Sequence, residues 1–509
     1  MSRVVAVSFG GSSESGRWSR STARRLLSAM CMLAASLTGA GVANGEGLGF
    51  DQLAALRAVG EVQLSPDGSL AAYTLVVPRR PGSDDDGPAW QELHVVAMAN
   101  GSDRSFISGH VNVSAIRFTP DGKLITYLAK RGDDEHAALW AIPVDGGESR
   151  RLLSFATAIT DYRISPDGTR IAFVALEPES EARKKAEEEG FDQEVFEEDW
   201  LPRKVWIAEL PGYEPEVSDP TLEEPDVEPE ALPLEGSAFH VRWNPDGEWL
   251  AVDLAPSPLI DDRYMNRRVH VVNAISGTTR AVIANPGKLG DFEFSPDGRT
   301  VAMISAADPH DPKDGRLMIV PTAGGELRDV LPGLEGHVSA FSWRETGVLE
   351  FLADEGVETR LGEVELVSGR QTSHLISGST SDGTMVPVMH SLSLSADGTR
   401  MAVVGDTPRH PSEVYAIDRG VTAPRRLTDS NPWLASVDLV PQEVFRWQGR
   451  DGLGLEGILL RPAGADGLPL IMMVHGGPEG HRRNGWLTSY SAPAQVAASR
   501  GYAVFFPNY

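Results

Sequence analysis

The residues of this sequence that are best suited to chemistry are His475, Gly476, Gly477 and Pro478, which follow the apolar run 470–474. The oxyanion of an acyl-transfer intermediate is stabilised by backbone N–H groups that have no other partner. Glycines suit such a donor loop because no Cβ blocks the approach of a substrate. We therefore interpret this segment as an oxyanion loop, with the N–H of Gly476 or Gly477 as donor and His475 orienting the loop. A tight turn without a catalytic role is the alternative.

The chain contains no motif for the nucleophile that such a loop would serve. In α/β-hydrolases the second oxyanion donor is the residue after the nucleophile, and the catalytic Ser, Asp and His follow the donor loop in the sequence. No Gly-x-Ser-x-Gly occurs in the 509 residues, and Ser489 and Ser491 lie at a predicted helix start, not on a strand-to-helix elbow. We therefore predict no catalytic triad residue in this chain and expect the triad after Tyr509. Residues 481–483 are interpreted as a cover for the loop, with contact to substrate as the alternative.

A second candidate site is the carboxylate pair Glu197 and Glu198, in an acidic part of the chain. Two carboxylates suit the free amine of a peptide through charge-assisted hydrogen bonds; a solvated end of a helix is the alternative. The acidic run 84–86 lacks the alternating ligands of a calcium loop, so we predict no metal site, and no motif indicates a cofactor. The net charge of −26 argues against a nucleic-acid partner, whose binding proteins carry basic patches.

The N-terminus has the order of a secretory signal peptide. Five arginines precede the apolar run 26–37, and Gly41-Val42-Ala43 offers a cleavage site, so we interpret residues 1–43 as a signal. The run is too short to span a bilayer as a stable helix, and we predict no membrane span after the signal is removed. The protein is then periplasmic or secreted, by the general or the twin-arginine route. The only cysteine, Cys31, lies inside the signal.

A four-residue motif recurs between pairs of apolar strands. Proline presets φ, aspartate bonds the turn backbone and glycine adopts positive φ, so the motif predicts a hairpin turn. The full copies are Ser65-Pro66-Asp67-Gly68, Thr119-Pro120-Asp121-Gly122, Ser165-Pro166-Asp167-Gly168, Asn244-Pro245-Asp246-Gly247 and Ser295-Pro296-Asp297-Gly298, with weaker copies at 395–398 and 343–347.

The spacing of these turns is close to 50 residues, which predicts a seven-bladed β-propeller over residues 47–435. One longer interval contains an acidic insertion, residues 176–235. Within it, 180–189 reads as an exposed helix, and 213–235, with five prolines and no Lys or Arg, reads as an extended, solvated loop.

The pattern changes after residue 435. An edge hairpin is predicted over 445–462, a continuous apolar strand over 470–474, a helix over 491–500 and a buried strand over 502–506. A continuous apolar strand is typical of a sheet that is covered on both faces. The sequence therefore predicts an all-β seven-bladed propeller followed by the beginning of an α/β-hydrolase domain, residues 436–509.

This order of segments resembles the prolyl oligopeptidase family of serine peptidases, and most closely its acylaminoacyl-peptidase and dipeptidyl-peptidase branch. The resemblance covers residues 47–509 and is most specific in the junction from Arg426-Leu427-Thr428-Asp429 to His475-Gly476-Gly477-Pro478. It implies a peptidase that hydrolyses short peptides through an acyl-enzyme, with the propeller excluding large folded proteins. In the dipeptidyl-peptidase branch a Glu pair on a propeller insertion binds the substrate amine, which is the role implied for Glu197 and Glu198.

Two other functions stay open at this point. The first is a non-catalytic periplasmic propeller that binds protein or peptide partners, although such a protein has no need of the segment after residue 435. The second is a naturally shortened, inactive member of the family. The leading expectation is an incomplete serine peptidase chain that is inactive by itself.

Overall fold

The computed structural model describes residues 46–210, 228–310, 313–381, 383–421, 423–477 and 480–509. The predicted signal 1–43 with Cys31, most of the predicted solvated loop 213–235, and Pro478 lie outside the described residues. No helix among the described residues combines the length and apolarity needed to cross a bilayer.

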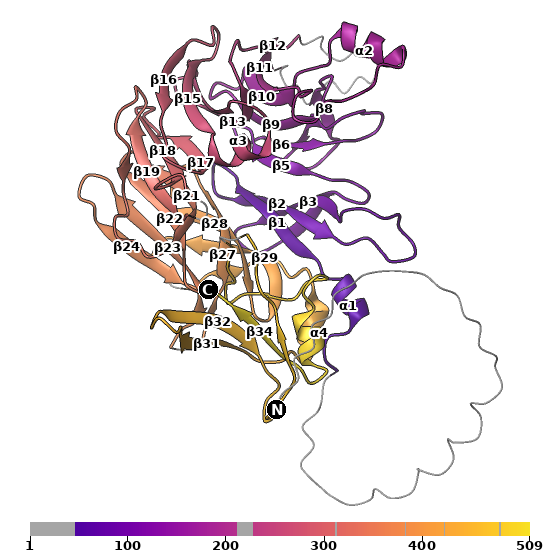
Figure 1. Cartoon of the computed structure of the whole chain (residues 1–509), viewed down its shortest axis with the longest axis vertical. Helices are drawn as coiled ribbons and strands as arrows, with labels where there is room; N and C mark the ends of the chain where they lie inside the picture. The colour runs from indigo at the N-terminus through magenta and orange to yellow at the C-terminus, as the bar shows by residue number, and fades with distance from the viewer. Residues whose placement is uncertain (1–45, 211–227, 311–312, 382, 422, 478–479) are drawn as a thin grey trace, which may run out of the picture. The chain divides into compact units, whose positions relative to one another are not determined.

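Seven four-stranded antiparallel sheets fill the described residues up to Arg426, in chain order (Figure 1). Sheets 1 to 3 consist of β1 (Ala58–Leu64), β2 (Leu70–Val77), β3 (Trp90–Ala97), β4 (Asp103–Ile107); β5 (Ser114–Phe118), β6 (Leu124–Ala129), β7 (Ala138–Pro143), β8 (Arg150–Leu153); and β9 (Ile159–Ile164), β10 (Arg170–Leu176), β11 (Arg203–Glu209), β12 (Glu230–Ala231). Sheets 4 and 5 consist of β13 (Ser237–Trp243), β14 (Trp249–Ala255), β15 (Arg268–Asn273), β16 (Thr279–Ile283); and β17 (Leu289–Phe294), β18 (Thr300–Ala306), β19 (Gly315–Pro321), β20 (Arg328–Asp329). Sheets 6 and 7 consist of β21 (His337–Glu345), β22 (Val348–Glu355), β23 (Glu358–Glu365), β24 (Gln371–Ile376); and β27 (Val388–Leu394), β28 (Arg400–Thr407), β29 (His410–Asp418), β30 (Arg425–Arg426), with the short pair β25 (Gly378–Ser379) and β26 (Met385–Val386) between them.

Apolar side chains hold each sheet to the next. Alternate residues of a strand point to opposite faces, and here both faces of the strands are apolar, so each sheet contributes to two hydrophobic cores. The cores join sheets 1 and 2, 2 and 3, 3 and 4, 4 and 5, 5 and 6, and 6 and 7. A further core joins sheet 1 to sheet 7, with Tyr73 and Val96 packed against Val404 and Val414. This arrangement is consistent with the predicted β-propeller.

The predicted hairpin turns are confirmed, each joining the first and second strands of a sheet. The turn glycine has a φ of 68° at Gly68, 75° at Gly168 and 65° at Gly398, in the left-handed region that favours glycine. In the Ser-Pro-Asp-Gly copies the serine hydroxyl donates to the aspartate carboxylate, at 2.6 Å from Ser65 to Asp67. That hydrogen bond is the main reason why the pKa of Asp67 is lowered. The turn aspartates are therefore structural.

Hydrogen bonds also join the first and last sheets of the series. The N–H of Leu64 donates to the Ser393 hydroxyl at 2.9 Å, and the N–H of Ala396 donates to the Pro66 carbonyl at 2.9 Å. Arg400 adds a bond to the Gly68 carbonyl at 3.0 Å. In Figure 1 the indigo strands β1 and β2 lie beside the orange β27 and β28. Sheet 1 thus closes the series against sheet 7.

The acidic insertion, residues 176–235, includes β11 and β12 and covers two connections of sheet 3, the link from β10 to β11 and the link from β11 to β12, most of which lies outside the described residues. Its predicted helix is α2 (Glu181–Glu188), with Ser180 as the N-cap accepting from the N–H of Arg183 and with no buried residue. Sheet 4 carries the short helix α3 (Ile260–Met265) in the equivalent connection, between β14 and β15. The insertion therefore lengthens two connections and leaves the four-stranded sheet intact.

The segment after residue 435 forms a mixed sheet, in the order β31 (Gln442–Gln448), β32 (Gly454–Leu460), β34 (Ala503–Pro507), β33 (Leu470–Met472). The predicted edge hairpin is confirmed as β31 and β32. Strands β33 and β34 are parallel and are joined through α4 (Ala494–Ala498), which is shorter than the predicted helix. The N-terminal helix α1 (Phe50–Ala54), η1 (Pro432–Ser436) and α4 share a small core that includes Leu53, Leu434 and Val496.

The prediction that 470–474 lies in a sheet covered on both faces is wrong for the described residues. Leu470, Met472 and Val474 are 55%, 54% and 59% exposed. Phe445 is 47% exposed on the same sheet, and a surface hollow of about 440 Å³ lies against these side chains. Only the opposite face packs, through Ile458, Leu460, Val504, Phe506 and the α4 alanines. The mixed sheet therefore has one covered and one open apolar face.

Candidate functional site

The His-Gly-Gly segment follows β33 as predicted. Met473 extends the pairing beyond the strand, since its N–H donates to the Phe505 carbonyl at 2.8 Å. The His475 side chain is 7% exposed and stacks on the Tyr509 ring, with ring centroids 4.4 Å apart and planes at 5°. The Tyr509 hydroxyl donates to the His475 carbonyl at 2.8 Å. Neither ring nitrogen of His475 has a hydrogen-bond partner among the described residues, so its observed contacts are those of a side chain that orients the loop.

The two glycines leave their backbone open. A Cβ added at Gly476 would meet no atom within 4 Å, and Gly477 has a φ of 137° that favours glycine. Within the described part of the chain, neither N–H donates to another residue. Unengaged donors beside open space are what an oxyanion site requires. Pro478, the fourth residue of the predicted loop, lies outside the described residues.

Arg483 joins the segment after this loop to sheets 6 and 7. Its guanidinium donates to Asp354 of β22 at 3.1 Å and to Nδ1 of His390 of β27 at 2.8 Å. His390 Nε2 lies 2.6 Å from Asp406 of β28, and Asp406 accepts from the N–H of Trp486 at 2.9 Å. We call these five residues the seam. Arg483 is thus a link to the ring of sheets and not merely a cover for the loop.

Other contacts support the seam. The N–H of Asn484 donates to the Val357 carbonyl at 2.7 Å, and the Gln442 amide donates to the Asn484 side chain at 3.0 Å. His481 lies 3.8 Å from Asp354. Burial lowers the pKa of His481, although the Asp354 carboxylate acts in the opposite direction. Arg482, by contrast, is exposed.

The seam could not be found from the sequence. Asp354, His390 and Asp406 stand alone on separate strands, and nothing in their neighbouring residues sets them apart from other polar strand residues. The only local signal is the arginine itself, eight residues after His475. The pairing becomes visible only when the ring brings sheets 6 and 7 to the C-terminal segment.

Glu197 and Glu198 lie in an exposed turn of the insertion. The N–H of Glu198 donates to the Val195 carbonyl at 3.0 Å, and Glu197 has a φ of +61°, which is uncommon for a residue with a side chain. Phe196 beside them is 87% exposed. Among the described residues, no hydrogen bond or ion pair links the two glutamates to the seam or to His475. The structure therefore does not bring the two predicted sites together.

A charged cluster that the sequence did not predict lies on the first strands of sheets 2 to 5. Asp161 lies 2.8 Å from Arg163, 3.4 Å from Arg242 and 3.6 Å from Arg117, and Arg242 lies 2.6 Å from Asp291. The arginines hold the pKa of the buried Asp161 well below its usual range. Asp161 and Arg163 share β9, whereas Arg117, Arg242 and Asp291 lie on β5, β13 and β17, so the cluster links four successive sheets by charge.

Glu293, on the same strand as Asp291, has a pKa that is raised well above its usual range. Burial, with the neighbouring Asp291 charge, raises the pKa of Glu293 to about 7. Burial also lowers the pKa of Arg163 to about 9, with the nearby Arg117 and Arg242 acting in the same direction. Glu293 is therefore the group beside this cluster that we expect to change its charge near neutrality.

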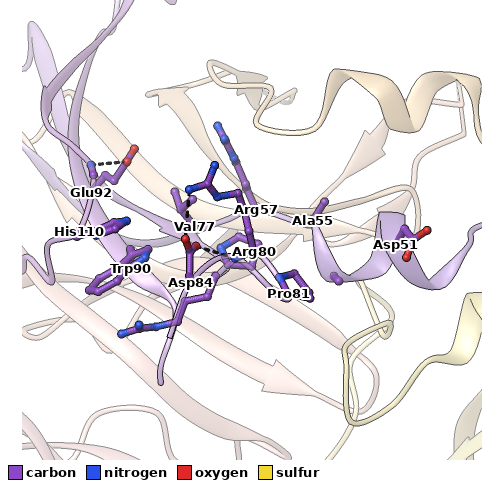
Figure 2. A pocket seen from close by; sticks show the side chains of 14 residues that line it. Asp51, Ala55, Arg57, Val77, Arg80, Pro81, Asp84, Trp90, Glu92 and His110 are labelled. Atoms are coloured by element: carbon purple, nitrogen blue, oxygen red, sulfur yellow. Dashed lines mark hydrogen bonds and ion pairs between the residues drawn. The ribbon is translucent and has the colours of Figure 1, made fainter. Parts of the chain in front are cut away.

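A cavity of about 530 Å³ lies beside α1 and the loop between β2 and β3 (Figure 2). Trp90 forms its aromatic wall, with the Arg79 guanidinium 3.8 Å from the ring centroid and the His110 ring stacked at 4.7 Å. Arg80 and Asp84 form an ion pair at 3.2 Å on its rim. None of the sequence-predicted site residues lines this cavity.

The sequence is similar to a propeller-domain family and to bacterial peptidases. The family described as the lipoprotein LpqB β-propeller domain matches residues 266–457. Dipeptidyl-peptidase 5 of Porphyromonas gingivalis is 25% identical over 94% of this chain and 71% of its own length. The uncharacterized peptidase YuxL of Bacillus subtilis is 26% identical over 90% of this chain and 70% of its own length.

Solved structures share the fold. An acylaminoacyl peptidase of Pyrococcus horikoshii superposes with a TM-score of 0.64 at 18% identity, and the match covers 90% of this chain and 66% of that peptidase. A puromycin-hydrolyzing peptidase of Mycobacterium tuberculosis gives a TM-score of 0.63 at 16% identity over 92% of this chain and 69% of that one. This chain thus spans slightly less than two thirds of the P. horikoshii peptidase.

Proposed function

We propose that this chain, whose propeller region is homologous to serine peptidases of the prolyl oligopeptidase family, supplies the propeller and the first part of the hydrolase domain of a peptidase that cuts short peptides. The single observation that carries the proposal is the reach of the similarity. The alignment to the dipeptidyl-peptidase covers 94% of the chain, so it must extend beyond the seven sheets into residues 436–509. A propeller used only for binding does not require that extension.

The mixed sheet supports this assignment. Parallel strands joined by a helix are the building unit of α/β sheets, and β33, α4 and β34 form one such unit. The open N–H groups of Gly476 and Gly477 follow its first strand, where an α/β-hydrolase places one oxyanion donor. In the proposed reaction a serine attacks the peptide carbonyl, a histidine takes its proton, and this loop stabilises the resulting oxyanion.

Substrate choice is assigned to the ring and its insertion. The seven sheets would limit access to short peptides, and Glu197 and Glu198 would bind the free amine of the substrate, so that residues are released from its N-terminal end. The basic, apolar N-terminus supports export of the enzyme to the periplasm or the medium. No nucleic acid and no cofactor takes part.

The 509 residues hold no Gly-x-Ser-x-Gly, so we expect this chain alone to be inactive. The test treats the purified chain, and any longer product of its reading frame, with a fluorophosphonate probe and with chromogenic dipeptides. The expected result is no labelling of this chain and labelling with turnover in the longer product. Labelling of a serine in this chain would contradict the proposed position of the nucleophile. A longer product that cleaves no peptide would contradict the proposed activity.

The amine anchor is tested separately in the active product. Glu198→Ala should raise KM for peptides with a free N-terminus and leave N-acylated peptides unchanged. Glu194→Ala, in the same acidic segment, is the matched control. Equal effects on both substrate classes would show that the pair is only a solvated acidic turn.

A second candidate is a propeller that binds protein or peptide partners without catalysis. The match of residues 266–457 to the LpqB propeller domain favours it, and the cavity walled by Trp90 offers a surface for a ligand. Under this alternative, a peptide should bind without turnover to every product of the gene. Trp90→Ala should then abolish binding, whereas changes at Gly476 should have no effect.

A further inference from the structure

Two buried glutamates of sheet 6 lie directly opposite each other. Glu350 of β22 pairs with Glu363 of β23 in the strand register, and the residues are 2% and 5% exposed. Like charges facing each other across strands destabilise a sheet, and an unpaired buried charge is costly. Their position on the face toward sheet 7 therefore requires a cation.

One arginine meets part of this requirement. Arg344 of β21 contacts the Glu363 carboxylate and lies 3.7 Å from Oε1 of Glu350. Arg419 lies 3.4 Å from Glu363 at the edge of sheet 7. Glu345 on the rim takes a second contact from Arg344, at 2.8 Å. Three carboxylates thus face two guanidiniums, which leaves one negative charge in excess among these described residues when the nearby His374 is neutral.

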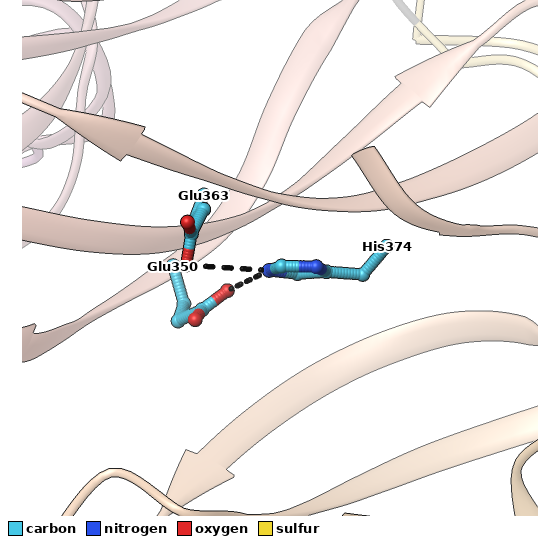
Figure 3. Close-up of side chains that lie close together, drawn as sticks. All are labelled: Glu350, Glu363 and His374. Atoms are coloured by element: carbon cyan, nitrogen blue, oxygen red, sulfur yellow. Dashed lines mark ion pairs between the residues drawn. The ribbon is translucent and has the colours of Figure 1, made fainter. Parts of the chain in front are cut away.

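The excess lies on the side of Glu350 that faces His374. Oε2 of Glu350 is buried and receives no hydrogen bond from any described residue. Figure 3 shows the His374 ring of β24 directed at both carboxylates. Its Nε2 lies 3.3 Å from Oε2 of Glu350 and 3.6 Å from Oε2 of Glu363. The three side chains each offer one atom within 4.8 Å of the others.

We propose that Glu350, Glu363 and His374 bind a divalent transition-metal ion such as Zn²⁺ between sheets 6 and 7. Zinc–nitrogen and zinc–oxygen bonds are about 2.0–2.2 Å long, so tetrahedral ligands lie about 3.3–3.5 Å apart, and two of the three separations here are close to that. Two carboxylates and one imidazole select Zn²⁺ or its neighbours over Ca²⁺ and Mg²⁺, which prefer oxygen ligands alone.

The site is structural in this proposal. The ion ties three neighbouring strands of sheet 6 at the face that packs on sheet 7, where Leu352 and Leu361 lie two residues from the two glutamates. Arg344 repels the ion, so the proposed site competes with a purely ionic arrangement. Binding should stabilise the folded chain by an amount that grows with the logarithm of the free metal concentration once this exceeds Kd.

The experiment titrates the purified, EDTA-treated chain with ZnCl₂ by calorimetry and follows its Tm. We expect one Zn²⁺ per chain, a higher Tm, and visible d–d bands of a tetrahedral site with Co²⁺. Since loss of an outer-shell partner already costs 10- to 100-fold in affinity, His374→Ala should cost at least about 100-fold. CaCl₂ and MgCl₂ should leave the Tm unchanged.

The control is His310→Ala, which removes an exposed histidine that also contacts a carboxylate, Asp308. It should bind Zn²⁺ as the unaltered chain does. Glu350→Gln keeps the side-chain volume and should also lose binding, with circular dichroism to confirm its fold. Absence of saturable binding, or binding that survives His374→Ala, would overturn the proposal and leave a protonated His374 as the cation that neutralises the cluster.

Discussion

The ring of seven sheets and the mixed sheet after residue 435 bury their apolar faces to different extents. Each ring sheet buries both faces, because a neighbouring sheet lies on either side. The mixed sheet buries the face that carries Ile458 and Phe506 and leaves Phe445, Leu470 and Met472 open. A row of exposed apolar side chains marks an interaction surface or a tendency to aggregate. Both faces of each ring sheet are thus covered, whereas one face of the mixed sheet lacks a covering element.

The largest expected difference between the two regions comes from matched aromatic deletions. Phe351 is fully buried between sheets 5 and 6, so Phe351→Ala should cost about 3–5 kcal/mol. Phe445 is 47% exposed and its ring contacts those of Trp447 and Phe505 on the open face, so Phe445→Ala should cost about 1 kcal/mol. Thermal and urea unfolding measure both. Equal losses would mean that the open face is packed in solution.

Polar substitutions in the two regions should change solubility in opposite directions. Met472→Ser and Phe445→Ser should reduce binding of an apolar dye and slow aggregation, because they remove exposed apolar area. Met303→Ser, fully buried in the ring, is the control and should promote aggregation. Light scattering during heating distinguishes the two.

The next effect depends on pH and concerns the interior of the ring. The pKa of Glu293 rises from 4.5 to about 7 in the folded state, so the folded chain holds this proton more tightly than the unfolded chain. Stability is then lost as pH rises from about 4.5 through 7, by at most about 3 kcal/mol. Glu293→Gln should raise Tm more at pH 8 than at pH 5, whereas Glu248→Gln, in an exposed turn, should change neither. A pH-independent effect would show that Glu293 is not buried in its charged form.

A smaller effect is expected at the seam that joins the two regions. Arg483→Ala removes charged hydrogen bonds to Asp354 and His390 and should weaken docking of residues 480–509 by about 1–3 kcal/mol. Hydrogen exchange should rise in the mixed sheet and not in sheets 1 to 5. Arg482→Ala is the matched control, with an exposed side chain. Unchanged exchange would mean that the small core beside α4 holds the segment by itself.

The smallest effect tests the repeated turn on which the ring prediction rests. Gly168 has a φ of 75° and open space where a Cβ would lie, so Gly168→Ala should cost about 1–2 kcal/mol through backbone strain alone. Gly168→Asn should cost less, because asparagine tolerates this conformation. Chemical unfolding of both variants provides the measurement. A larger loss for asparagine would indicate a steric cause instead.

The local features of this molecule could be predicted, and the long-range pairings could not. Ser165, Asp167 and Gly168 form their turn through contacts within four residues, so the turn can be predicted from the sequence. Arg483 and Asp354 come into contact only because the fold brings sheet 6 to the C-terminal segment. The residues next to either of them in the sequence do not indicate this pairing. The glycines at 476 and 477 suggested an oxyanion loop from the sequence alone; their N–H groups are unengaged in the described residues, and the catalytic role stays a prediction. The exposed face of Leu470 and Met472 was missed because a strand covered on one side has the same apolar composition as one covered on both.

The hydrogen bond between Leu64 and Ser393 joins residues 329 positions apart. A ribosome that adds 5–20 residues per second needs on the order of tens of seconds to make that stretch. During that time the nascent first sheet has no partner for the side that carries Tyr73 and Val96. This apolar face of sheet 1 therefore stays exposed, and open to contact with other chains, until sheet 7 has been synthesised.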